Sequence, residues 1–389
     1  MLKLLSLFSG IGAFEKALEN LEEPFEIVRY CEIDKYASKA YSLIHNLDEN
    51  MNLKDVTTVD TSILPDDIDI ITYGFPCQDI SLSGKQKGFI DQNGDLTRSG
   101  LFFEALHIIE QTKPKIAIAE NVKALTSKKF TAEFKIVLDC LNDAGYKNYW
   151  AVLNAKDYGI PQNRERVFIR NDIDHGFHFP AKYELKLRLK DLLEETVDEK
   201  YFISDKALAY VLSTGTKNFY YKPEIDLEVA RPLTSTMHKS HRASQDNYVS
   251  ESFVKDDVKV DIDCLPVKEA TKKGYKEAHD GDYVNLQFPN SKTRRGRVGE
   301  QIANTLLCND ANGVVDYPRI RKLTPKECFR LMGFDDKDCD ILVANKISNT
   351  QLYKMAGNSI VVDVLEEIFV ELLNQYADVF PYEEGAESC

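Results

Sequence analysis

The segment Leu4-Leu5-Ser6-Leu7-Phe8-Ser9-Gly10-Ile11-Gly12 decides the fold of this chain. An apolar run leads directly into a turn with two glycines, and an amphipathic segment follows at residues 13–21. A strand, a glycine turn and a helix in this order are typical of sheets that bind nucleotides, because backbone N–H groups at the helix start can reach a ligand. The turn lacks the third glycine of a dinucleotide fingerprint and the G-K-[ST] of a phosphate loop. Alone, it predicts a tight turn and leaves the ligand open.

Strand and helix signals alternate through the first half of the chain. Apolar runs predict strands at residues 4–8, 25–31, 68–72, 116–119 and 167–169. Helical spacing predicts helices at residues 13–21, 35–45, 101–111 and 130–144. This alternation predicts an α/β fold with a doubly wound, mostly parallel sheet that helices cover on both faces.

The pattern changes in the second half. Residues 184–317 have weak periodicity and mix turn residues, charged runs and short strand-like pieces, which predicts a smaller, irregular, β-rich domain. Helix signals return with Thr324-Pro325-Lys326-Glu327, a capping box that has proline at the first helical position. A last helix is predicted over residues 361–375.

Composition excludes several classes of protein. The 389 residues are 43% hydrophobic, which suffices for a packed core, and no apolar run reaches the roughly 18 residues that span a bilayer. Basic residues number 49 and acidic residues 63, so the net charge of −14 excludes a general basic coat for nucleic acid. Residues 231–245 and 291–299 reverse this balance, because they contain basic residues and no acid. The 8 cysteines form no C-x-x-C pair, which gives no metal motif and favours reduced thiols in a cytoplasm.

Polar groups follow the predicted strands in an ordered set. Cys77 and Glu120 each come after an apolar run, and Gln162, Arg164 and Arg166 alternate along an extended segment. Because the carboxyl ends of parallel strands meet at one edge of a sheet, we expect Cys77 and Glu120 to face one crevice. A lone cysteine is as often a small buried apolar residue, and any one of the arginines fits a surface salt bridge. The whole set favours a catalytic site.

Six short motifs, taken in order, resemble those of one family. They are Phe8-Ser9-Gly10-Ile11-Gly12, Glu32-Ile33-Asp34, Pro76-Cys77-Gln78, Glu120-Asn121-Val122, Gln162-x-Arg164-x-Arg166 and Ala356-Gly357-Asn358-Ser359. In these the chain is similar to the DNA (cytosine-5)-methyltransferases of the prokaryotic restriction–modification type, over about residues 1–180 and 318–376. The resemblance implies the S-adenosylmethionine-dependent methyltransferase fold. It also implies a catalytic and cofactor-binding domain at residues 1–183, completed by residues 318–389, and a target-recognition domain at residues 184–317.

The resemblance implies a covalent mechanism. Cys77 would add as a thiolate to carbon 6 of a cytosine flipped out of duplex DNA, and S-adenosyl-L-methionine would supply the methyl group for carbon 5. A free cysteine is only about 3% thiolate at pH 7, so Cys77 needs activation. Glu120 would hydrogen-bond or protonate ring nitrogen 3, and burial could raise its pKa for this purpose. Arg166 would contact the cytosine carbonyl oxygen, with Arg164 supporting the loop and the nearby charge.

The resemblance and the basic stretches also name binding residues. The expected cofactor contacts are Phe8, Ser9, Gly10, Gly12, Glu32, Ile33, Asp55, Pro76, Asn358 and Ser359. The expected DNA contacts are Ser81, Ser83, Lys85, Lys87, Arg98, Gln162, Arg231, Lys239, Arg242, Arg294, Arg295 and Arg297. Basic residues spaced by serine, threonine and glycine suit phosphate and groove contacts, so we expect DNA affinity to fall steeply with salt.

Three other functions remain open at this point. The chain could be a tRNA cytosine-5 methyltransferase, an oxidoreductase that uses the glycine turn for a dinucleotide, or a DNA-binding module without activity. The large region between Gln162 and Arg321, with its basic segments, favours double-stranded DNA as the partner. The set of Cys77, Glu120 and Arg166 disfavours the other two functions. We expect a monomer on DNA in a bacterial cytoplasm or nucleoid, encoded by a bacterium or a phage. The sequence leaves open whether a companion restriction endonuclease accompanies it.

Overall fold

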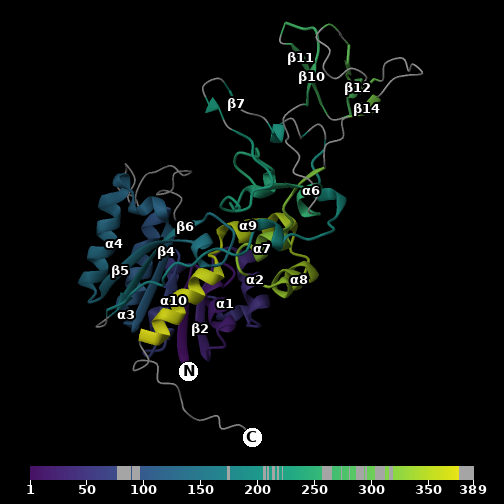
Figure 1. The fold of residues 1–389 in the computed structure, drawn as a ribbon. Coiled ribbons are helices and arrows are strands. Elements are labelled where there is room, and N and C mark those ends of the chain that lie inside the picture. The colour runs from purple at the N-terminus through teal and green to yellow at the C-terminus, as the bar shows by residue number, and fades with distance from the viewer. Residues whose placement is uncertain are drawn as a thin grey trace.

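A six-stranded sheet forms the centre of the computed structural model (Figure 1). The structure describes residues 1–76, 89, 97–172, 176–204, 207, 210–212, 215–216, 219–220, 222–255, 265–272, 274–279, 281–285, 293, 296–302, 312–314 and 319–375. The strands are β1 (Leu2–Leu7), β2 (Phe25–Cys31), β3 (Ile70–Tyr73), β4 (Ile116–Val122), β5 (Lys147–Asn154) and β6 (Glu165–Asp172), in the order β2-β1-β3-β4-β6-β5. The strands β1 to β4 pair in parallel, and β6 runs antiparallel to both its neighbours. The predicted doubly wound, mostly parallel sheet is confirmed.

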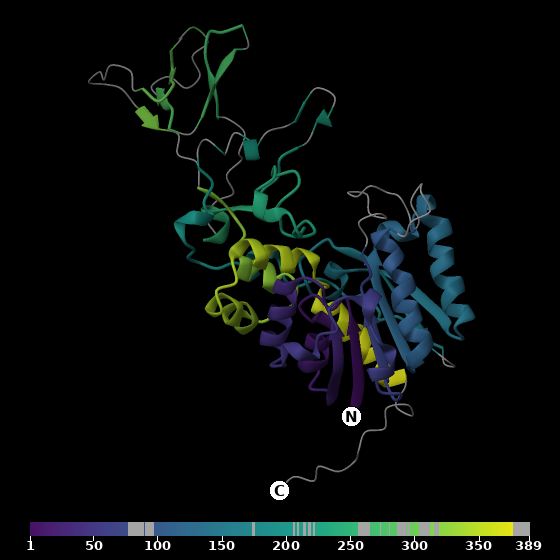
Figure 2. The same cartoon turned by 180° about the vertical axis from the view of Figure 1, so that it is seen from behind.

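Alternation along the strands sends apolar side chains to both faces of the sheet. On one face, Leu4 and Ile118 pack with helices α1 (Ala13–Asn20) and α10 (Val362–Gln375). On the other face, Leu5 and Ala119 pack with α3 (Phe102–Thr112) and α4 (Thr131–Asp143). Burial on both faces explains why the parallel strands are continuous apolar runs. Figures 1 and 2 show the resulting three layers from opposite sides.

The segment after residue 319 returns to the first helices. Its helices are α7 (Pro325–Arg330), α8 (Asp336–Ala344), α9 (Asn349–Asn358) and α10. Thr324 and Glu327 form the predicted capping box at the start of α7. The buried Lys16 of α1 bonds Asp335 at 2.9 Å and Asp338 at 3.0 Å, and Phe14 lies edge-to-face on Phe369 of α10. The last segment is therefore part of the same packed unit as the first helix.

Between residues 176 and 322 the described chain is irregular and β-rich, as predicted. Its elements are β7 (Gly215–Thr216), β8 (Phe219–Tyr220), β9 (Tyr248–Ser250), α6 (Glu251–Val254), β10 (Leu265–Lys268), β11 (Tyr275–Ala278), β12 (Tyr283–Asn285), β13 (Val298–Gly299), β14 (Asn312–Val314) and β15 (Ile320–Lys322). These strands pair antiparallel and form small sheets of two or three strands each. In Figure 1 this part extends away from the large sheet, beyond its carboxyl-end side. No helix in the described part of the chain is long and apolar enough to cross a membrane.

Candidate active site

The glycine turn after β1 has a left-handed backbone. The φ angles of Phe8, Gly10 and Gly12 are 53°, 59° and 81°. A Cβ atom on Gly10 would meet no atom within 4 Å, so the turn borders open space there. The amide of Gly10 donates to Glu32 Oε2 at 2.9 Å, and the amide of Asp34 donates to Glu32 Oε1 at 2.7 Å. The carboxylate at the end of β2 is thereby fixed beside the turn.

The surroundings of this turn fit the expected cofactor. Ile33, directly after β2, is 74% exposed, which is unusual for an isoleucine and offers an apolar surface to a flat ring. The buried hydroxyl of Ser9 has no hydrogen-bond partner among the described residues. Burial raises the pKa of the Glu32 carboxyl, although hydrogen bonds from the Asp34 and Gly10 amides oppose the shift. An open turn, an unsatisfied hydroxyl, a fixed carboxylate and an exposed apolar side chain together suit a nucleoside ligand.

The carboxyl ends of β3 and β4 place Glu120 beside the segment that leads to Cys77. Tyr73 pairs with Ala119, and a Cβ atom on the next residue, Gly74, would lie 3.7 Å from Glu120 Oε2. The small residue thus leaves room for the carboxyl group. Cys77 itself lies outside the described residues, and Pro76 is the last one described before it.

Arg166 pairs with Glu120 across two antiparallel strands. Val122 is opposite Arg166 in the register of β4 and β6, so Glu120 is its diagonal neighbour on the same face. Arg166 Nε lies 2.9 Å from Glu120 Oε1. Burial raises the pKa of the Glu120 carboxyl, and the charges of Arg166 and Arg164 act against this increase. A carboxyl group with these opposing influences can exchange a proton with a nearby base more readily than an exposed glutamate.

Asn121 contributes a contact that the sequence did not reveal as functional. Its Nδ2 donates to the carbonyl oxygen of Phe75 at 3.0 Å, and its side chain is buried. The bond fixes the backbone two residues before Cys77. The only signal for it in the sequence is its place inside the Glu120-Asn121-Val122 motif.

Arg164 lies among backbone carbonyls. Its guanidinium donates to Leu233 O at 2.9 Å, to Gly357 O at 3.1 Å and to Ser359 O at 2.7 Å. Its side chain therefore connects its own strand entrance to two distant segments, at Leu233 and at residues 357–359, and its charge also acts on Glu120. This agrees with a supporting role near the site.

The position of Gln162 differs from the one expected. We expected it to contact DNA, but its side chain is fully buried. Its Nε2 donates to Leu331 O at 2.8 Å, and its Oε1 accepts from the Leu233 amide at 3.0 Å. Both polar ends are used inside the protein, so the interface assignment is wrong.

Gly357 explains how the C-terminal motif meets the segment around Leu233. A Cβ atom there would lie 2.2 Å from the Thr234 carbonyl carbon and 2.4 Å from the Ser235 nitrogen. Next to it, Asn358 is exposed, and Ser359 is buried and donates from Oγ to Ile360 O at 3.2 Å. Asp55, another expected cofactor residue, caps a short turn by accepting from the Thr57 amide at 3.0 Å.

The expected DNA contacts divide into three groups. Lys239 is exposed, Arg231 pairs with Glu224 at 2.9 Å, and the half-buried Arg242 lies over the Tyr210 ring at 5.4 Å. Arg297 is only 3% exposed and donates from Nε and Nη2 to Asn285 O, so its assignment as a DNA contact is wrong for the same reason as that of Gln162. The residues outside the described part are Ser81, Ser83, Lys85, Lys87, Arg294, Arg295 and the side chain of Arg98.

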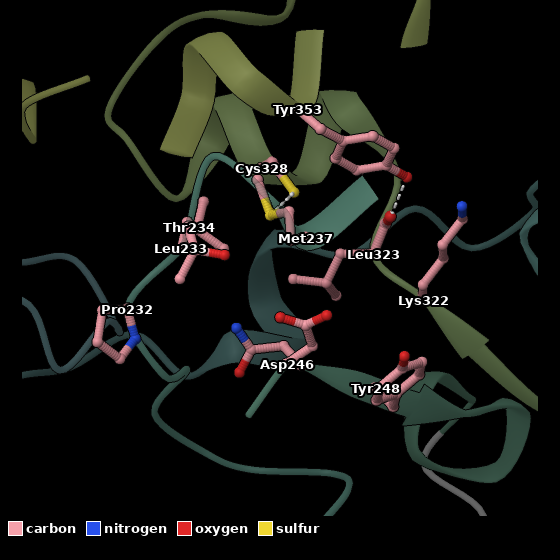
Figure 3. Close-up of a pocket in the computed structure, with 11 residues that line it drawn as sticks. Pro232, Leu233, Thr234, Met237, Asp246, Tyr248, Lys322, Leu323, Cys328 and Tyr353 are labelled. Atoms are coloured by element: carbon pink, nitrogen blue, oxygen red, sulfur yellow. Dashed lines mark hydrogen bonds between the residues drawn. The ribbon is translucent and has the colours of Figure 1, made fainter. Parts of the chain in front are cut away.

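A small cavity lies between the Leu233 segment and helices α7 and α9 (Figure 3). Asp246, Lys322 and Cys328 are among its lining residues, and Tyr353 donates to Leu323 O at 2.5 Å at its edge. Its volume of about 20 Å³ suits a single water molecule and excludes a nucleoside. No cluster of metal-ligating side chains occurs in the described ranges.

Comparison with known proteins supports one family. The family model of C-5 cytosine-specific DNA methylases matches residues 2–374. The chain is 33% identical to the orphan methyltransferase M.SPRI of Bacillus phage SPR, over 96% of this chain and 98% of that protein. It is 31% identical to the type II methyltransferase M.HhaI of Haemophilus parahaemolyticus, over 94% and 93% of the two chains.

Two solved structures share the fold. The methyltransferase EhMeth of Entamoeba histolytica has a TM-score of 0.64 and 16% identity, over 96% of this chain and 98% of that chain. The S. pombe Dnmt2 methyltransferase has a TM-score of 0.62 and 18% identity, over 98% and 100%. These two similarities show a shared α/β fold. The chain belongs to the family of C-5 cytosine-specific DNA methylases, which makes it a DNA (cytosine-5)-methyltransferase.

Proposed function

We propose that this enzyme methylates carbon 5 of a cytosine flipped out of double-stranded DNA, through a covalent bond between Cys77 and carbon 6. The observation that carries this proposal is the position of Glu120. It is a carboxyl group that is 14% exposed, beside the strand end that leads to Cys77, and paired with Arg166. A group of this kind can serve the ring nitrogen while a thiolate attacks the ring.

The chain's residues would share the reaction as follows. The Cys77 thiolate forms a bond to carbon 6, and the electron pair of the carbon 5–carbon 6 double bond moves toward ring nitrogen 3. Glu120 stabilises this nitrogen by a hydrogen bond or a proton. Carbon 5 then becomes nucleophilic and takes up the methyl group. After a base has removed the proton from carbon 5, the double bond re-forms and Cys77 leaves as a thiolate.

Arg166 would bind the carbonyl oxygen of the cytosine and keep Glu120 in place. Its Nε already contacts Glu120, while its Nη1 donates to the carbonyl of Glu165 at 2.9 Å. The guanidinium is therefore fixed from two sides before the base enters. Such preorganised donors lower the cost of charge that develops during a reaction. Asn121 would help by fixing the backbone ahead of Cys77.

The residues around the glycine turn fit S-adenosyl-L-methionine, which supplies an electrophilic methyl group when bound. Glu32 would accept hydrogen bonds from the ribose, and Ile33 would cover the adenine. Phe8, Ser9, Gly10, Gly12, Asp55, Pro76, Asn358 and Ser359 would complete the pocket. The open space at Gly10 and the unsatisfied Ser9 hydroxyl support this assignment.

We further propose that residues 184–317 form the target-recognition domain and that residues 1–183 and 318–389 form the catalytic domain. The exposed Lys239 and the neighbouring Arg231 and Arg242 support a DNA-facing surface on the smaller part. Ser81, Ser83, Lys85, Lys87, Arg98, Arg294 and Arg295 are assigned to the same interface on sequence grounds.

Base-resolution mapping of 5-methylcytosine tests the proposal. The wild type and Cys77→Ser are expressed in a host that lacks this modification, with Cys140→Ser as the matched control because that thiol lies on the outer helix α4. We expect methylation at one short sequence in the wild type and the control, and none in Cys77→Ser. Methylation by Cys77→Ser would exclude the covalent route, and unmethylated DNA with methylated RNA would exclude DNA as the substrate.

A further inference from the structure

We propose that His45 is a positioning residue for the cofactor, because its imidazole supports the glycine turn from inside and makes cofactor affinity depend on pH. The inference rests on the proposed function of that turn. His45 lies at the C-terminal end of α2 (Lys35–Ile44), outside every motif that the sequence analysis used.

The imidazole occupies the space that the glycine leaves. A Cβ atom on Gly12 would lie 1.9 Å from His45 Nε2, so only glycine permits this contact. The side chain of His45 is fully buried. Its Nε2 lies 3.2 Å from the carbonyl oxygen of Ile11, in the middle of the turn. The ring and the turn are therefore packed directly against each other.

Both ring nitrogens face acceptors. Nδ1 lies 2.6 Å from Glu19 Oε1, and Nε2 faces the Ile11 carbonyl, which cannot donate. A neutral imidazole has one N–H and one lone pair, so it can satisfy only one of these acceptors. The imidazolium has two N–H groups and satisfies both. The geometry thus selects the charged form of His45.

The groups around the ring favour the same form. Glu15 and Glu19 of α1 are the carboxyl groups near the ring, Tyr41 packs against it at 4.7 Å, and Tyr30 of β2 lies behind Tyr41. The Tyr41 hydroxyl donates to Glu15 at 2.9 Å, which holds that carboxylate in place. Burial lowers the pKa of His45, but the bond to Glu19, the charges of Glu15 and Glu19 and the Ile11 carbonyl outweigh it and raise the pKa overall.

The sign of the pH dependence follows. Since the pKa of His45 is higher in the folded protein than in the unfolded chain, its stabilising effect is complete below about pH 6.5 and is lost as pH rises through the folded pKa. After deprotonation one nitrogen turns a lone pair toward Glu19 or toward Ile11. The turn loses a fixed contact under the cofactor site, so affinity for the cofactor decreases.

Calorimetric titration with S-adenosylhomocysteine between pH 6 and 8.5 tests this. We expect the Kd of the wild type to increase about 5- to 10-fold over this range, the size of one lost hydrogen bond. His45→Gln can still donate to Ile11 but cannot titrate, so its Kd should change with pH only as far as the ligand itself titrates. His107→Gln, which changes an exposed histidine on α3, is the control and should follow the wild type. Titration of the ligand itself is common to all variants and cancels in the comparison.

Glu19→Gln supplies the second variant. Without this carboxylate the pKa of His45 should fall, and the midpoint of the wild-type affinity curve should move to lower pH. The histidine signal followed by NMR in the ligand-free protein gives that midpoint independently. Parallel curves for the wild type and His45→Gln would overturn the proposal. If His45→Gln does not fold, an unchanged midpoint in Glu19→Gln would overturn it.

The two proposals remain distinguishable. If S-adenosylhomocysteine binds with the expected pH dependence but no DNA is methylated, only the proposed reaction fails. If the wild type does not bind S-adenosylhomocysteine at any pH, the cofactor assignment fails and the role of His45 fails with it.

Discussion

Arg166 Nε and Glu120 Oε1 lie 2.9 Å apart, across the strands β6 and β4. Arg166 lies on β6, which runs antiparallel to β4, the strand that carries Glu120. Burial raises the pKa of Glu120, and Arg166 limits that increase. The pair therefore holds a largely covered carboxyl group next to a positive charge.

Replacing this carboxyl group should impair the chemical step. For Glu120→Gln we expect a decrease of about 10²- to 10⁴-fold in the single-turnover rate of methylation, because the amide can donate a hydrogen bond but cannot transfer a proton in the same way. Binding of S-adenosylhomocysteine should be unchanged. Glu110→Gln on the exposed face of α3 is the control. A variant rate within threefold of the wild type would remove Glu120 from the mechanism.

Gly357 should not tolerate a methyl group. Since its Cβ would lie within 2.4 Å of the backbone of Thr234 and Ser235, Gly357→Ala must push that segment away. Overpacking of this kind costs about 1–3 kcal/mol in the free energy of unfolding, measured by urea denaturation. Gly176→Ala is the matched control, because nothing lies within 4 Å of a Cβ there. Equal stability of both variants would contradict the close contact.

Lys239 should contribute charge to DNA binding. It is exposed within a basic stretch, so Lys239→Ala should weaken binding of all DNA sequences alike. The slope of log Kd against log salt should decrease by about 1, as one released counterion requires. Lys135→Ala, on the exposed side of α4, should leave the slope unchanged. An unaltered slope in Lys239→Ala would place the DNA elsewhere.

Asp363 should destabilise the protein in alkaline solution. Burial, followed by the charge of Glu366, raises its pKa to about 7. A raised pKa means that its favourable contribution is complete below the pKa of about 3.9 in the unfolded chain and is lost as pH rises through about 7. Asp363→Asn should therefore raise the melting temperature at pH 8.5, and by clearly less at pH 5, which lies closer to the pKa of the unfolded chain. The exposed Asp139→Asn is the comparison, and an equal change at both pH values would exclude this explanation.

Local patterns predicted much of the fold. The strand β2 has the predicted bounds, and α1, α2 and α10 agree to within one residue at either end. The strand β5 was missed, because it is the edge of the sheet and its burial is incomplete along most of its length. The helices α8 and α9 were also missed, because their apolar residues follow helical spacing less clearly than those of α1 and α2.

The site shows the same division. The ordered motifs predicted Glu120 and Arg166 at one site, and the register of β4 and β6 brings them side by side. Gln162 and Arg297 could not be distinguished from interface residues, because their partners are backbone groups of segments that the sequence does not place nearby. Alternation along a strand tells which residues share a side, but only the tertiary structure shows what that side meets. His45 lies in none of the six motifs, so no sequence pattern was a reason to select it.

The return of α10 to α1 has a consequence for how the protein is made. The two helices are separated by roughly 350 residues, and at about 5–20 residues per second a ribosome needs roughly 20–70 s to connect them. During that time Phe14 of α1 lacks its contact with Phe369, and the part of α1 that packs against α10 is uncovered. The nascent chain therefore exposes a hydrophobic surface of the kind that chaperones bind. A chain whose translation stops before residue 362 therefore lacks the helix that covers Phe14.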